Sequence, residues 1–81
     1  MFYYTYVLRS KADGKLYTGW SDNLKQRMQS HARGLVIATK NRLPVELIYY
    51  EACTDKEAAI EREKQLKTGF GRAYLKRRLK I

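Results

Sequence analysis

The sequence predicts one small α/β domain, of the α+β kind, built on an antiparallel sheet. Two observations support this prediction. Aromatic and β-branched segments alternate with segments of helical periodicity, and turn or capping residues separate them in the order strand, strand, helix, strand, helix, helix. With 81 residues, the chain is expected to form a single domain, residues 1–81, around one modest core.

Two strands and a turn are predicted near the N-terminus. Phe2–Arg9 and Leu16–Trp20 are rich in aromatic and β-branched residues, and Lys11–Gly14 has the composition of a turn. A four-residue loop from Ser10 to Asp13 would set Tyr6 directly opposite Tyr17, whereas a two-residue Asp13-Gly14 turn would offset them. Either register brings both phenols to one face of the sheet.

Capping and stop signals bound the later elements. Thr54, followed three residues on by Glu57, has the form of a capping box, and glycines at positions 34 and 69 fit helix ends. The expected elements are a helix capped by Ser21 or Asp22 and running to about Arg33, a strand at Val45–Tyr50, a helix running to about Thr68, and a helix at about Arg72–Lys80.

The charge of the chain predicts an anionic partner. The formal net charge is +9, and a phosphate chain rewards many Lys and Arg residues at once, which favours nucleic acid. For the charge alone, a solvated surface is the alternative. A membrane partner is not expected, because no segment is suited to span or coat a bilayer. The basic residues expected to follow a phosphate backbone are Lys40, Arg42, Arg72, Lys76, Arg77 and Arg78.

Cysteine usage favours a reducing compartment. Cys53 is the single cysteine, so an internal disulfide is excluded. One Cys and one His cannot form a structural zinc site alone. Because the N-terminus also lacks the regions of a signal peptide, the expected location is cytoplasmic.

The first helix carries two polar residues within its apolar stripe. The stripe expected to face the sheet has the spacing i, i+3, i+4, i+7 and comprises Leu24, Arg27, Met28 and His31. A buried arginine without an anion is costly, so a bound phosphate is one explanation for Arg27. The alternatives are that Arg27 lies at the edge of the stripe with its head in water, and that His31 is a satisfied core histidine.

The second helix shows the same pattern at Glu63. Its expected apolar stripe comprises Ala59, Ile60, Leu66 and Phe70, and Glu63 lies in the middle of it. A lone carboxylate suits a hard divalent cation that keeps most of its waters and takes another ligand from a phosphate. The alternative is an ion pair with Arg62, Lys64 or Lys67.

These residue types together can carry out phosphodiester hydrolysis. A tyrosine can take a proton from water if nearby positive charge lowers its pKa from about 10. An arginine can hold the phosphate as negative charge grows in the transition state. A carboxylate can hold a metal ion that stabilises the leaving oxygen.

Over nearly its whole length, the chain resembles the GIY-YIG nuclease superfamily. The resemblance rests on Tyr6 in Thr-Tyr-Val, Tyr17 in Tyr-Thr-Gly, and the spacing of the helical Arg, His and Glu. It is most similar to the short single-domain bacterial proteins of that superfamily, which are related to the N-terminal domain of the excision-repair endonuclease subunit. The resemblance implies a three-stranded antiparallel sheet flanked by helices, and hydrolysis of a DNA strand with one Mg²⁺ or Mn²⁺ ion.

The resemblance also implies roles for individual residues. Tyr6 would be the general base, and Tyr17 would position water or share the proton. Arg27 would bind the scissile phosphate, and Glu63 would hold the metal. His31 would support the tyrosines.

The chain departs from the family pattern in two ways. Only the tyrosines and Gly19 of the two motifs are kept, and Gly19 would admit the substrate backbone where a Cβ would intrude. Family nucleases often carry an asparagine about a dozen residues after the glutamate, and none follows Glu63 here.

The sequence therefore predicts a metal-dependent DNA endonuclease of repair or recombination. We expect selectivity for DNA structure rather than sequence, because no separate reader module is present and phosphate contacts do not specify sequence. The alternatives are a non-catalytic nucleic-acid-binding module and a small subunit that joins a protein partner in a larger DNA-processing assembly. The sequence sets no oligomeric state.

Overall fold

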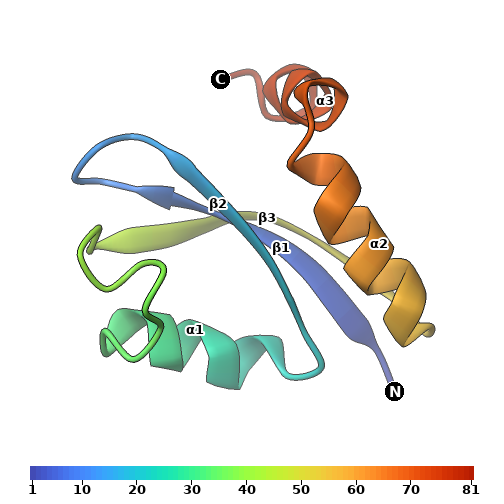
Figure 1. Ribbon diagram of the computed structural model, residues 1–81, viewed down its shortest axis with the longest axis horizontal. Helices are drawn as coiled ribbons and strands as arrows, with labels where there is room; N and C mark the ends of the chain where they lie inside the picture. Colours follow the sequence, from blue (N-terminus) through green and yellow to red (C-terminus); the bar gives the residue numbers. More distant parts are fainter.

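The computed structural model describes all residues 1–81, and the predicted order of elements is confirmed (Figure 1). The sheet is antiparallel, with strand order β2-β1-β3, so β1 is its central strand. The elements are β1 (Tyr3–Ser10), β2 (Leu16–Ser21), α1 (Leu24–Ala32), β3 (Val45–Cys53), α2 (Lys56–Leu66) and α3 (Gly69–Leu79).

The sheet separates two helical layers, with α1 on one face and α2 and α3 on the other (Figure 1). Successive residues of β1 point to opposite faces. The Tyr6 side chain meets α1, whereas Val7 is fully buried in a core with Leu66 and Leu75. Tyr6 therefore faces α1, whereas Thr5 and Val7 face α2 and α3, where the apolar core forms.

The hairpin register differs from the one in which the tyrosines pair directly. Tyr6 pairs with Gly19, because the hairpin closes between Ser10 and Lys15, and Gly14 adopts a φ of +73° in the turn. The two tyrosines are therefore offset by two residues. Their predicted common face is confirmed, since the ring centroids of Tyr6 and Tyr17 lie 6.4 Å apart.

Both predicted helix caps were placed one or two residues too early. Asn23 caps α1 through its side-chain oxygen, while Ser21 is still the last residue of β2. Asp55 caps α2, so the capping box expected at Thr54 does not form. In each case the side chain next to the first helical turn reaches its free backbone N–H groups.

A tight corner ends α2 earlier than expected. Thr68 caps α3, and a Cβ at Gly71 would collide with the last turn of α2, so glycine allows the two helices to approach. The prediction that Phe70 belongs to the apolar stripe of the second helix was wrong. Phe70 lies in the first turn of α3, and its side chain is 91% exposed.

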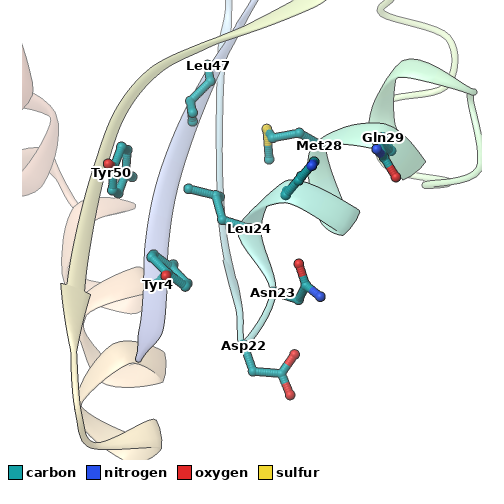
Figure 2. Close-up of a pocket in the computed structure, with 9 residues that line it drawn as sticks. Tyr4, Asp22, Asn23, Leu24, Met28, Gln29, Leu47 and Tyr50 are labelled. Carbon is teal, nitrogen blue, oxygen red and sulfur yellow. The ribbon is translucent and has the colours of Figure 1, made fainter. Parts of the chain in front are cut away.

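Helix α1 covers only part of the sheet face against which it packs. A groove lies between α1 and the strands β1 and β3, and none of the residues predicted for the site lines it (Figure 2). The apolar residues that line it are Tyr4, Leu24, Met28, Leu47 and Tyr50. No helix is long and apolar enough to cross a membrane.

Candidate active site at the β2 edge

Tyr6 lies at the centre of a buried polar cluster. Its side chain is fully buried, and its phenol oxygen lies 2.9 Å from His31 Nε2 and accepts a hydrogen bond from Arg27 Nε at 3.3 Å. A Cβ on Gly19 would lie only 2.5 Å from the same oxygen. The space above Gly19, expected for a substrate backbone, is therefore filled by the Tyr6 phenol.

His31 is held at both ring nitrogens. Nε2 contacts Tyr6, and Nδ1 lies 2.8 Å from the hydroxyl of the fully buried Thr39. Burial, with a smaller effect of the Arg27 charge, lowers the pKa of His31 to about 4. The imidazole is therefore neutral at pH 7, with one nitrogen donating and the other accepting. Thr39 was not anticipated, because nothing in its loop sequence marks it as a partner of His31.

Arg27 lies beside both tyrosines. Its hydrogen bond to Tyr6 is the largest cause that raises the pKa of Arg27, and Tyr17 acts in the same direction. The guanidinium therefore stays charged, yet no carboxylate lies within 4.0 Å of it. Arg27 thus carries an unneutralised positive charge in a half-buried position.

The two tyrosines differ in environment. Burial raises the pKa of Tyr6, and the hydrogen bond from Arg27 only partly opposes this effect. Tyr6 therefore keeps its proton in the free protein. Tyr17 is half-buried rather than fully buried, and its ring lies 5.4 Å from that of His31. Of the two tyrosines, Tyr17 is therefore the one that is partly exposed.

Glu63 reaches the site from α2, on the other face of the sheet. Its negative charge is one of the causes that raise the pKa of Tyr6, so the two groups lie within electrostatic range. The side chain is 18% exposed, and one carboxylate oxygen lies 3.7 Å from Lys67 Nζ. The ion pair expected as the alternative is therefore present. No group of three or more His, Cys, Asp or Glu side chains surrounds a common point.

The predicted basic residues separate into different environments. Arg72 donates a long 3.5 Å hydrogen bond to the hydroxyl of Thr18, which lies between Tyr17 and Gly19 on β2. Arg42 is instead tied to the hairpin turn, where it pairs with Asp13 at 3.3 Å. Four further side chains are exposed, one on the loop before β3 and three on α3; they are Lys40, Lys76, Arg77 and Arg78.

Comparisons with known proteins place the chain in a family. The family described as "GIY-YIG catalytic domain" matches residues 2–79. A UPF0213 protein of Clostridium perfringens is 42% identical over 79% of this chain and 69% of its own length. One from Streptococcus pyogenes is 48% identical over 74% of this chain, and the aligned part is 65% of that relative. The chain thus spans about two thirds of the length of these relatives.

A solved structure supports the same assignment. The solution NMR structure of a UPF0213 protein from Bacillus halodurans is 32% identical and covers 93% of this chain and 82% of its own, with a TM-score of 0.57. The family match over residues 2–79 spans all strands and helices described above and includes the positions of the two tyrosines, Arg27 and Glu63. The chain therefore belongs to the GIY-YIG family, and its relatives are the short UPF0213 proteins.

Proposed function

We propose that this protein is a divalent-metal-dependent endonuclease that hydrolyses a phosphodiester bond in DNA. The observation that carries the proposal is the Arg27 guanidinium, which lies beside two tyrosines without a carboxylate partner. A phosphate would supply the missing negative charge. The net charge of +9 favours the same partner at long range.

In this mechanism Arg27 holds the scissile phosphate and stabilises the charge that grows on it. Tyr17 would act as the general base that takes the proton of the attacking water, because Tyr17 is partly exposed, whereas Tyr6 is fully buried. Tyr6 would position Arg27, and neutral His31 would fix the orientation of Tyr6.

Glu63 would hold one Mg²⁺ or Mn²⁺ ion in this proposal. A single carboxylate fits a hard ion that keeps most of its waters and takes a further ligand from the substrate phosphate. When bound, such an ion stabilises the negative charge of the leaving oxygen. The Glu63 carboxylate would then separate from Lys67, whose ammonium could contact the DNA backbone instead.

We further propose that the substrate is a branched, nicked or damaged DNA of repair or recombination, handled in the cytoplasm. The support is the distribution of charge. The candidate contacts are arginine and lysine side chains suited to phosphates, and phosphate contacts carry no sequence information. A protein partner could add selectivity that this small surface does not supply.

Paired tyrosine variants test the mechanism. The measurement is the cleavage rate of branched, nicked and single-stranded DNA with Mg²⁺ or Mn²⁺. We expect Tyr17→Phe to lower the rate by about 10²–10⁴-fold, the usual contribution of a positioned acid or base. Tyr50→Phe is the matched control, because its ring is exposed on β3 and lies outside the site. Cleavage that persists unchanged in Glu63→Ala would contradict the metal assignment.

Two observations favour a second candidate, a nucleic-acid-binding module without catalysis. Glu63 is already neutralised by Lys67, and burial keeps Tyr6 protonated. This function predicts tight, salt-dependent DNA binding with no product across all the substrates and both metals. Cleavage that is lost in Arg27→Ala would exclude it.

A further inference from the structure

The half-buried arginines of this protein fall into two groups. Three of them are paired with carboxylates at 3.0–3.3 Å. The paired residues are Arg9 with Glu46, Arg42 with Asp13, and Arg62 with Glu51. The other two, Arg27 and Arg72, contact only hydroxyl groups. Because a guanidinium removed from water needs compensating charge, these two positions favour an incoming anion.

Both unpaired arginines reach the same strand from opposite faces of the sheet. Arg27 extends from α1 to the face that carries Tyr6 and Tyr17. Arg72 extends from α3 to Thr18, whose side chain points to the other face, since neighbouring residues of a strand alternate. Thr18 directly follows Tyr17, which is one of the groups that raise the pKa of Arg27, so both guanidiniums lie close to this part of β2.

The two flanks of α3 carry different kinds of residue. Tyr74 lies on the flank toward β3, where its hydroxyl is 2.9 Å from that of Tyr49 and its ring is 5.0 Å from Arg62. Arg72 lies on the opposite flank, toward β2, and Lys76 follows it at the i+4 spacing of a helix face. Positive charge therefore continues along α3 beyond the Thr18 contact.

We propose that Arg72 binds a second phosphate of the DNA strand, next or next but one to the phosphate held by Arg27. The strand would then cross β2 from the α1 side to the α3 side, and Lys76 would contact the phosphate beyond. The long 3.5 Å bond to Thr18 leaves most Arg72 donors free for a bidentate phosphate contact. This inference rests on the proposed DNA substrate, and it makes Arg72 a positioning residue.

The test is equilibrium binding of a short DNA without divalent metal, so that no cleavage occurs. Arg72→Gln should weaken binding about tenfold and reduce the slope of log affinity against log salt by about one, as expected for one lost phosphate contact. Arg33→Gln removes the same charge from an exposed position at the end of α1, and it should change affinity about twofold. Thermal unfolding of each variant shows that the fold is kept.

A phosphate scan then locates the contact. Each phosphate of the DNA is replaced in turn by a neutral methylphosphonate, and the loss of affinity is compared between wild type and each variant. We expect the loss at one phosphate to vanish in Arg72→Gln, and the loss at a phosphate next or next but one to it to vanish in Arg27→Gln. Arg72→Lys should restore the salt slope but only part of the affinity, because lysine cannot make a bidentate contact.

The outcomes separate this inference from the proposed function. Wild-type protein that binds no DNA would overturn both. Wild-type protein that binds the DNA, with Arg72→Gln equal to Arg33→Gln in affinity and salt slope, would overturn the inference alone. Phosphates for Arg27 and Arg72 that lie far apart would also overturn it.

Discussion

The two edges of the sheet carry the same residue types, but the charged residues have different partners at each edge. At the β3 edge, Glu51 receives three guanidinium hydrogen bonds from Arg62 and one from the Tyr49 hydroxyl. At the β2 edge, the corresponding arginine, Arg27, donates a hydrogen bond to Tyr6, and the glutamate, Glu63, pairs with Lys67 rather than with the arginine. Each edge thus holds two tyrosines, an arginine and a glutamate.

The difference between the edges lies in where the carboxylate is placed. When glutamate and arginine meet directly, the charges cancel and the cluster joins α2 to the sheet. When they are kept apart, the arginine has no carboxylate partner, and the glutamate pairs with Lys67 instead. Residue composition alone therefore does not distinguish a structural cluster from the cluster that we propose to be catalytic.

The largest expected effect comes from exchanging one arginine at each edge for alanine. Arg27→Ala should lower the rate of DNA cleavage by about 10²–10³-fold, because one transition-state donor is lost, and should change stability by less than about 1 kcal/mol. Arg62→Ala removes the same charge, but it should affect the stability of the fold rather than cleavage. It should lower the free energy of unfolding by about 1–3 kcal/mol and leave the cleavage rate per folded molecule unchanged.

These two variants are measured by cleavage rate and by urea unfolding. The comparison between the edges fails if Arg62→Ala abolishes cleavage in a folded protein, or if Arg27→Ala unfolds the chain without affecting the rate of its folded fraction.

Acid should weaken the β2 edge through His31. The folded protein holds its pKa near 4, against 6.5 in the unfolded chain, so the unfolded state binds the proton between these values. The stability contributed by neutral His31 is therefore fully present above pH 6.5 and is lost as the pH falls toward 4, by up to about 3 kcal/mol.

The control for this pH dependence is His31→Gln. Carboxylates titrate in both proteins, so the difference between their free energies of unfolding at pH 7.5 and pH 4.5 isolates the histidine. A wild-type loss no larger than that of the variant would contradict a buried neutral imidazole.

A smaller effect is expected at the glycine of the second tyrosine motif. Gly19→Ala should destabilise the fold by about 1–3 kcal/mol and lower cleavage, because the new Cβ would displace the Tyr6 phenol. Gly69→Ala is the control, since a Cβ there meets nothing within 4 Å. Thermal unfolding measures both changes. Equal stability of the two variants would mean that Gly19 serves another purpose, such as the approach of substrate.

Local patterns predicted what depends on local geometry. Helical spacing placed Arg27 and His31 on one face of α1, and strand alternation placed Tyr6 and Tyr17 on one face of the hairpin, whatever its register. The order of strands and helices followed from the same periodicities and from the turn residues.

Features that depend on tertiary contacts were missed or left open. Thr39 reaches His31 from an irregular loop, and Phe70 is exposed because Gly71 allows α3 to pack against the end of α2. Arg72 could not be distinguished from Arg77 as a candidate, since only the folded chain brings one of them to Thr18. The ion pair between Glu63 and Lys67 was one of several pairings of Glu63 that the sequence allowed.

The most direct test of the account is an NMR titration that follows the arginine Nε–H signals of the labelled protein as a short DNA is added without divalent metal. We predict that the signals of Arg27 and Arg72 at the β2 edge shift together on binding, while those of Arg62 and Arg9, which are already paired with carboxylates, stay in place. Shifts at Arg62 and Arg9 with none at Arg27 would contradict the claim that the β2 edge is the phosphate site.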